Sequence, residues 1–421
     1  MKFEKYALCE PLKRNLANHG FHRPTDIQFK SITPILRGED VLAIAQTGTG
    51  KTAAFAIPII ERIHTGKVSK RVEGIGCLVL VPTRELAKQI AGVFERLAAH
   101  SRVSVYSLHG GEEQDPQILR LQKGIDVLIA TPGRMFDLIH QQHLDVSTVE
   151  MLVLDEADHM LDLGFIDDIR YVKKMLPTRH QTVFMSATID KHIKKTAYAL
   201  VRGNAIRIQL SPKDPVAKNV EHFVMFVKHD DKRFFLEEFL NDHAESKVIV
   251  FVRTRVRAER VVKAMARVGL DCVLLHGEME QAERSSVLDA FREGQHRVLV
   301  ATDVSARGID VPDVEFVINY DLPVKTANYV HRVGRTGRGT SKGVAISFCS
   351  EEERSVLEEI ETFIQKPVDE LRVGRKAYRR TVEIMKKTDA EPEALFDSLE
   401  TLVQEQGLYE DRRPKRRKRK S

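Results

Sequence analysis

The sequence has 421 residues, of which 42% are hydrophobic and 30% are charged, the composition of a globular protein with about two domains. No apolar run approaches the roughly 20 residues that a membrane-spanning helix needs, and the first residues lack the apolar core of a signal peptide. The four cysteines are far apart and form no C-x-x-C pair, so neither a disulfide framework nor a zinc site is expected. These features predict a cytoplasmic protein without a membrane partner.

Short runs rich in Val, Ile and Leu recur along the chain, and each is followed by a longer segment with helical spacing. Continuous apolar strands that alternate with helices predict parallel sheets covered by helices, an α/β fold. Two series of runs predict two tandem α/β domains. The runs are 41–45, 77–81, 127–130, 151–154 and 182–185, then 248–252, 273–275, 298–301, 314–318 and 344–347.

Two prolines interrupt any helix or central strand near residue 213, which predicts an interdomain linker over 210–217. The first domain is then expected over 1–209 and the second over 218–366. Residues 350–353 read Ser-Glu-Glu-Glu, a capping box that predicts the start of a helix. Beyond these domains, residues 367–421 contain no strand-like run and predict a helical or disordered extension with a basic tail.

A phosphate-binding loop follows the first predicted strand, where the chain reads Ala45-Gln46-Thr47-Gly48-Thr49-Gly50-Lys51-Thr52 before a helical stretch. Gly48 and Gly50 let the backbone curl so that amide N–H groups converge on phosphate oxygens at a helix N-terminus. Lys51 is predicted to reach the β- and γ-phosphates of ATP, and the Thr52 hydroxyl to ligate Mg²⁺. Ala45 replaces the usual first glycine of the loop.

The sequence Asp155-Glu156-Ala157-Asp158 comes directly after the predicted strand 151–154. Carboxylates at the C-terminal end of a parallel strand lie where such sheets bind ligands. Asp155 is therefore predicted to hold Mg²⁺, directly or through water. Glu156 is predicted to orient and deprotonate the attacking water.

These four letters are the signature of the DEAD-box RNA helicases, and the chain resembles that family over about residues 3–350, loosely its bacterial RhlE-type branch. The resemblance implies two tandem RecA-like domains, ATP as substrate, Mg²⁺ as cofactor and RNA as partner. It also implies RNA-stimulated ATP hydrolysis that unwinds short RNA duplexes or remodels ribonucleoproteins, carried out by a monomer.

The predicted ATP site combines the phosphate loop with three segments that resemble family motifs. Residues 1–29 contain a likeness of the Q motif, in which Phe21 stacks on adenine and Gln28 bonds both its donor and its acceptor. Guanidinium groups supplied across a cleft stabilise the charge of a phosphoryl transition state, and two arginines of 331–338 match the arginine fingers. The catalytic set is Lys51, Asp155, Glu156, Arg335 and Arg338. The nucleotide-binding set is Phe21, Thr25, Gln28, Ala45, Gln46, Thr47, Gly48, Thr49, Gly50, Lys51, Thr52, Asp310 (the ribose contact), Arg335 and Arg338.

Two further sets follow from the resemblance. Residues that couple the ATP state to unwinding are Asp158, Ser186, Thr188 and His331. Residues that bind RNA are Arg84, Gly111, Thr131, Arg134, Thr254, Gly277, Gln281, Arg284 and Thr302. The arginines suit phosphates as charged forks, and the glycines allow close backbone approach. No aromatic ladder occurs among them, so recognition is expected to follow the sugar–phosphate backbone. Arg253 and Arg255 replace the more usual Asn and Lys, which predicts extra phosphate affinity.

Some alternatives stay open at this point. An ATP-gated RNA clamp with little unwinding uses the same motifs, and a DNA helicase of the same superfamily is conceivable. The basic tail, with eight Lys or Arg among residues 412–420, is expected to be disordered and to tether RNA without sequence preference. A targeting role for this tail is the alternative. The RNA substrate and any protein partners cannot be read from the residues.

Overall fold

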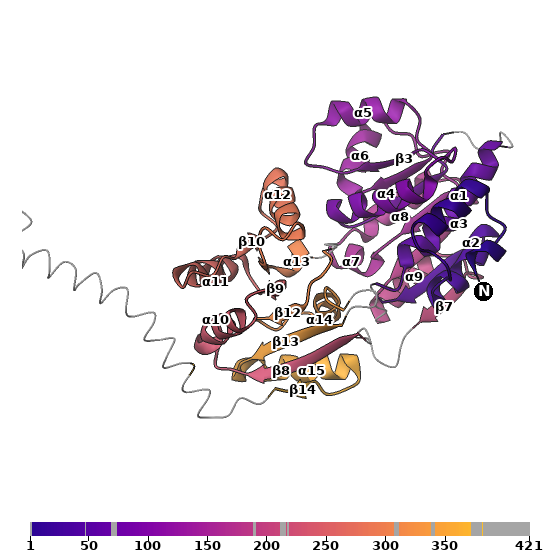
Figure 1. The fold of residues 1–421 in the computed structure, drawn as a ribbon. Helices are drawn as coiled ribbons and strands as arrows, with labels where there is room; N and C mark the ends of the chain where they lie inside the picture. Colours follow the sequence, from indigo (N-terminus) through magenta and orange to yellow (C-terminus); the bar gives the residue numbers. More distant parts are fainter. Residues whose placement is uncertain are drawn as a thin grey trace, which may run out of the picture.

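The structure is a computed structural model of the chain that describes residues 2–46, 48–68, 74–187, 191–210, 216, 219–306, 311–337, 342–371 and 381. Two seven-stranded sheets organise these residues, and every registered strand pair is parallel. In Figure 1 the unit built on the first sheet lies at the upper right and the unit built on the second sheet at the lower left. The predicted fold class, two tandem parallel sheets covered by helices, is confirmed.

The first sheet has the strand order β3-β4-β2-β5-β6-β1-β7. Its strands are β1 (Val41–Ala45), β2 (Cys77–Leu80), β3 (Val105–Leu108), β4 (Val127–Ala130), β5 (Met151–Leu154), β6 (Gln181–Ser186) and β7 (Ile206–Leu210). Its helices are α1 (Glu10–Asn18), α2 (Asp26–Leu36), α3 (Lys51–Val68), α4 (Arg84–Ala98), α5 (Gln114–Gln122), α6 (Pro132–His140), α7 (Ala157–Asp162), α8 (Ile166–Met175) and α9 (Lys191–Leu200), with a 3-10 turn at Phe3–Lys5.

The second sheet has the order β10-β11-β9-β12-β13-β8-β14. Its strands are β8 (Val220–Phe226), β9 (Val248–Phe251), β10 (Val273–Leu275), β11 (Val298–Ala301), β12 (Phe316–Asn319), β13 (Gly343–Cys349) and β14 (Asp369–Glu370). Its helices are α10 (Lys232–Asp242), α11 (Arg255–Arg267), α12 (Gln281–Arg292), α13 (Asp303–Ala306), α14 (Thr326–Val333) and α15 (Arg354–Ile364), with 3-10 turns at His229–Asp231 and Glu351–Glu353.

Each sheet separates two hydrophobic cores, because successive side chains of a strand point to opposite faces. In β1, Val41 and Ala43 belong to one core and Leu42 to the other. In β9, Ile249 and Val250 are divided in the same way. Burial on both faces explains why the central strands are continuous apolar runs in the sequence.

All ten predicted strands occur, but β3, β7, β8 and β14 were not predicted. β7 lies at the edge of its sheet and has one buried residue, Ile208; polar residues alternate with its apolar ones, so it lacks a continuous apolar run. The predicted capping box is present, with the Ser350 amide donating to Glu353 Oε2 at 3.1 Å, and α15 follows it. The domain boundaries stay a prediction. The basic tail at 412–420 lies outside the described residues.

No helix in the described part of the chain is long and apolar enough to cross a membrane. All four cysteines are described, and none forms a disulfide.

Candidate functional site

The phosphate loop joins the end of β1 to the start of α3. Gly48 and Gly50 adopt left-handed backbone angles, with φ of +76° and +89°. A Cβ atom on Gly50 would lie 2.5 Å from Gln28 Nε2, so no larger residue fits there. Thr49 Oγ1 donates to the Gln46 carbonyl at 2.7 Å and closes the loop on itself. The loop is therefore a fixed cradle of amides at the N-terminus of an 18-residue helix.

The segment that resembles the Q motif braces this loop. Gln28 Nε2 donates to the Gly50 carbonyl at 3.2 Å, and Thr25 Oγ1 donates to the Thr49 carbonyl at 2.9 Å. The Thr25 amide donates to Gln28 Oε1 at 2.9 Å. A primary amide has two donors and two acceptor positions, so Gln28 keeps one N–H and one lone pair for a base. Its contact with adenine, and that of the half-buried Phe21, stay predictions.

Lys51 and Asp155 are close enough for the charge of Lys51 to act on the carboxyl group of Asp155. Lys51 Nζ is buried and has no hydrogen-bond partner among the described residues, which is costly for an ammonium group. Burial raises the pKa of Asp155 to about 6, the charge of Lys51 opposes this rise, and the charges of Glu156 and Asp158 add to it. A buried cation that lacks hydrogen-bond acceptors suits phosphate oxygens, and crowded carboxylates suit a bound cation.

Glu156 is the N-cap of α7 and has a left-handed backbone, with φ of +47°. Such a conformation is uncommon for a residue with a Cβ and is concentrated at functional sites. Burial alone would raise the pKa of Glu156, but His159, Arg335 and His331 lower it to about 2. Because its pKa is lowered, Glu156 is ionised at neutral pH and can accept a hydrogen bond from a water molecule; its predicted part in deprotonating that water stays a prediction.

Glu156 belongs to the first sheet and Arg335 to the segment after α14 of the second, so the site is built across two domains. Arg335 is 5% exposed, and its Nε donates to the His331 carbonyl at 3.0 Å. His331 Nε2 also lies 3.7 Å from Asp158 Oδ2, again across the interface. The predicted coupling residues Asp158 and His331 are thus brought together, and Ser186 is buried at the end of β6. Thr47, Thr188, Asp310 and Arg338 lie outside the described residues.

Arg332 is a residue that the sequence analysis missed. Its side chain is 1% exposed, and its Nη2 donates to Asp303 Oδ2 at 2.9 Å while its Nη1 donates to the Asp321 carbonyl at 2.6 Å. It therefore ties α13, which begins at Asp303, to α14, the helix directly before Arg335. Its position among the arginines of 331–338 was the only feature of the sequence that pointed to Arg332. That position does not distinguish an arginine with a structural role from an arginine finger.

The predicted RNA-binding residues gather in a cleft of about 820 Å³ between the two domains. The first domain contributes the segments after β2, β3 and β4, and the second contributes the loop before α12 and the start of that helix. Seven of the nine predicted residues line it: Arg84, Gly111, Thr131, Arg134, Gly277, Gln281 and Arg284. Thr302 is buried and bonded to Ser305, and Thr254 lines a different pocket.

Arg84 links the two sides of this cleft and explains why one of its glycines, Gly111, has no side chain. Arg84 Nη1 donates to Gln281 Oε1 at 3.2 Å, which links the two domains. A Cβ on Gly111, where φ is +79°, would lie 2.0 Å from that same Arg84 nitrogen. Arg134 donates from Nη2 to the Glu112 carbonyl at 3.1 Å. The guanidinium groups are thus held in position along the cleft.

Two arginines are more engaged than the sequence suggested. Arg284 is 9% exposed and donates to Glu85 Oε1 in the other domain at 3.0 Å and to the carbonyls of His276 and Ser305 at 3.2 Å. In this arrangement Arg284 forms an ion pair that holds the two domains together. Arg253 lies against Glu353, 2.9 Å away, so its side chain is part of an internal ion-pair network.

A phosphate loop, a strand-end carboxylate pair and an arginine from a second parallel α/β domain define a two-domain nucleotide hydrolase. The sequence matches the family described as DEAD/DEAH box helicase over residues 25–196 and the helicase conserved C-terminal domain over 231–340. It is 38% identical to the DEAD-box ATP-dependent RNA helicase CshA of Bacillus cereus over 369 residues, 88% of this chain and 69% of that one. It is also 38% identical to eukaryotic initiation factor 4A of Caenorhabditis elegans, over 88% and 90% of the two chains. The chain belongs to the DEAD-box ATP-dependent RNA helicase family.

Solved structures of similar sequence share this two-domain fold. S. cerevisiae Dbp5 bound to RNA and ADP BeF3 matches with a TM-score of 0.81 at 30% identity, over 92% of this chain and 99% of that one. A Dbp5 variant bound to Gle1 and IP6 matches with a TM-score of 0.72 over 92% and 98%. Placement in the RhlE-type branch stays a prediction.

Proposed function

We propose that this chain couples RNA-stimulated ATP hydrolysis to the separation of short RNA duplexes or the remodelling of ribonucleoproteins. One observation carries the proposal. The charge of Arg335 in the second domain lowers the pKa of Glu156 in the first, and the charge of Lys51, whose buried ammonium has no hydrogen-bond partner among the described residues, acts on the adjacent Asp155. Such a site is complete only when the domains are together, so hydrolysis can respond to RNA that bridges them.

In this proposal Lys51 and the loop amides hold the ATP phosphates, and Gln28 with Phe21 holds adenine. Arg335 stabilises the charge that develops on the transferred phosphoryl group, and Arg338 and Asp310 are proposed to assist at the phosphates and the ribose. Glu156, which is ionised, accepts a hydrogen bond from the attacking water and orients it. Asp158 and His331 link this chemistry to the position of the second domain.

Mg²⁺ is proposed to bind through Thr52 and Asp155. The buried Asp155 carboxyl, whose pKa is raised next to two other carboxylates, suits a divalent cation. Within the described residues no three His, Cys, Asp or Glu side chains group as a metal site of their own. That suits an ion held by few side chains and completed by phosphate oxygens. The bound ion would neutralise charge on the β- and γ-phosphates.

RNA is proposed to occupy the 820 Å³ cleft and to contact Arg84 and Arg134 through its phosphates. The cleft has few aromatic groups, so little base readout is expected. The alternative function, an ATP-gated RNA clamp with little unwinding, is favoured by one feature. Two polar contacts, Arg84–Gln281 and Arg284–Glu85, close the cleft across the domains. Measuring duplex separation per ATP hydrolysed distinguishes the two functions.

We also propose that the protein acts as a monomer in the cytoplasm, with ribonucleoproteins among its targets. The four unpaired cysteines suit a reducing compartment. Gel filtration with light scattering tests the monomer, and fractionation of cells tests the location.

Arg335→Ala tests the function. ATP binding should be nearly unchanged, while RNA-stimulated turnover should fall by about 10³–10⁵, the effect of an arginine finger in related hydrolases. Fluorescent-nucleotide titration measures binding, and phosphate release measures turnover. A variant that hydrolyses ATP at the parental rate would remove Arg335 from the mechanism.

A further inference from the structure

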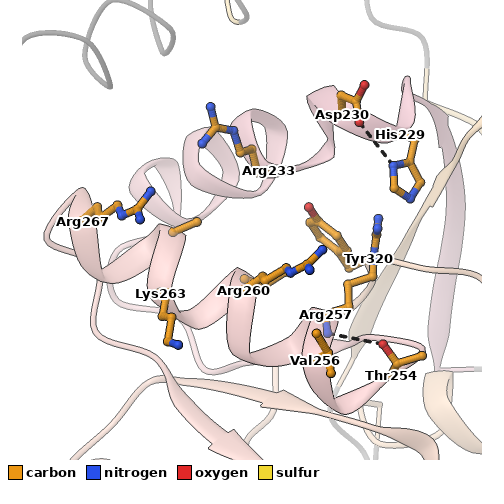
Figure 2. A pocket seen from close by; sticks show the side chains of 12 residues that line it. His229, Asp230, Arg233, Thr254, Val256, Arg257, Arg260, Lys263, Arg267 and Tyr320 are labelled. Carbon is orange, nitrogen blue, oxygen red and sulfur yellow. Dashed lines mark hydrogen bonds and ion pairs between the residues drawn. The ribbon is translucent and has the colours of Figure 1, made fainter.

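A second pocket, of about 600 Å³, lies on the second domain and shares no lining residue with the cleft. It is formed between α10 and α11, and Figure 2 shows side chains of both helices around it. Five of its lining residues are cationic, namely Arg233, Arg257, Arg260, Lys263 and Arg267, and Asp230 is the only acid. Its charge is therefore strongly positive within an otherwise near-neutral fold.

Four of these cations share one face of α11. Arg257, Arg260, Lys263 and Arg267 are spaced by three, three and four residues, which places them in line along a helix. Like charges at this spacing destabilise a helix by about 0.2–0.5 kcal/mol per pair. Arg260, Lys263 and Arg267 are exposed, and within the described part of the chain no ion pair or hydrogen bond engages their side chains. An unbalanced cationic line on a concave surface suits a polyanion.

The floor of the pocket indicates which part of a polyanion it would contact. Tyr320 is 5% exposed, and its ring lies under Arg257, 5.3 Å from the guanidinium carbon. Arg257 is also held by Asp321 at 2.9 Å. The aromatic ring is therefore covered and offers no face on which a base could stack. The groups that remain accessible are charged donors, which bind phosphate oxygens.

The N-terminal end of α11 adjoins the RNA cleft. Thr254 caps the helix and lines the basic pocket. The next residue, Arg255, forms an ion pair with Glu278. Glu278 stands between Gly277 and Met279, and both of these line the cleft. The N-terminal end of α11, from which its basic face extends, therefore lies next to the cleft.

We infer that the basic face of α11, with Arg233 of α10 opposite, binds the sugar–phosphate backbone of RNA that extends beyond the cleft. This inference rests on the proposed function. The 13 residues of α11 span about 18 Å at ~1.5 Å per residue. A stacked strand rises about 3.4 Å per nucleotide, so about five further phosphates could lie along the helix.

The test uses the full chain and single-stranded RNAs of increasing length. The variant Arg260→Ala/Lys263→Ala/Arg267→Ala removes three cations of the pocket. The matched control, Arg14→Ala/Lys174→Ala/Arg179→Ala, removes three exposed cations of the first domain that line neither pocket. Fluorescence anisotropy measures RNA affinity at two salt concentrations, and phosphate release measures ATP hydrolysis at saturating RNA.

RNA affinity should increase with RNA length and then level off. In the parent and the control it should keep increasing for about five nucleotides beyond the length at which the affinity of the pocket variant levels off. Three lost phosphate contacts, each worth about −0.7 in the log–log salt slope, should flatten that slope by about 2. The advantage of the parent over the variant should therefore shrink roughly 20-fold between about 50 and 200 mM salt. Turnover at saturating RNA should be the same in all three proteins.

Equal length dependence and equal salt slopes for parent and pocket variant would overturn the inference. Variant-sensitive binding of inorganic tripolyphosphate without any change in RNA length dependence would overturn it as well, because the pocket would then serve a small polyphosphate. Failure of the proposed function looks different, since the parent itself would then show no RNA-stimulated hydrolysis with RNA of any length.

Discussion

The ion pair between Glu85 and Arg284 should control how firmly the two domains close on RNA. The two side chains are each about 10% exposed, and a guanidinium nitrogen lies 3.0 Å from the carboxylate. At an effective dielectric constant of about 20, two unit charges at 3 Å attract by about 5–6 kcal/mol before desolvation is subtracted. Close charge pairs across protein interfaces show net coupling of about 1.5–7 kcal/mol.

Glu85→Gln keeps the shape and one acceptor oxygen but removes the charge. Arg284 also keeps its two carbonyl acceptors. The coupling free energy lost in the variant should therefore fall at the low end of that range, about 1.5–2 kcal/mol. Because the pair joins the start of α4 to α12 of the other domain, this free energy is lost from the closed arrangement alone. RNA affinity in the presence of a non-hydrolysable ATP analogue should weaken roughly 10–30-fold, at about 1.4 kcal/mol per tenfold.

The assay is RNA anisotropy with and without the analogue, together with energy transfer between dyes on the two domains. RNA affinity without nucleotide should barely change, and the transfer signal of the closed state should fall. Glu95→Gln, an exposed position on the same helix, is the matched control. If Glu85→Gln bound RNA as tightly as the parent in the presence of the analogue, the Glu85–Arg284 pair would contribute nothing to the free energy of domain closure, and this reasoning would be refuted.

Three further predictions concern hydrolysis, nucleotide choice and the tail. Glu156→Gln should bind ATP and trap RNA without turnover, because the amide is neutral and cannot take up a proton; normal phosphate release would exclude it from the reaction. ATP should be preferred over GTP, because guanine inverts the donor–acceptor pattern that Gln28 meets and an unpaired buried group costs about 1–3 kcal/mol; equal turnover of both nucleotides contradicts this. Deleting residues 411–421 should raise the RNA concentration for half-maximal hydrolysis and flatten its salt dependence, with saturated turnover unchanged. An unchanged salt slope would favour a targeting role for the tail.

The sequence alone determined the elements whose physics is local. A strand buried on both faces must be apolar throughout, so runs such as 41–45 and 248–252 were legible, and β1 and β9 occupy those runs. The phosphate loop could be predicted for a similar reason, since its glycines adopt backbone angles that other residues avoid. The edge strand β7 has one buried residue among five and no continuous apolar run, so the sequence carried no comparable signal for it.

Only the tertiary structure decided what each charged side chain does. The sequence predicted phosphate contacts for Arg284 and added phosphate affinity for Arg253. The structure adds partners that the sequence did not indicate, since Arg284 forms an ion pair across the domains and Arg253 lies against Glu353. Arg332 and Arg335 stand three residues apart in one arginine-rich run. Arg332 is hydrogen-bonded to Asp303, whereas the charge of Arg335 lowers the pKa of Glu156. A charge has the same sequence signature wherever it lies. Its role depends on burial and on partners up to about 200 residues away along the chain, and packing alone brings these together.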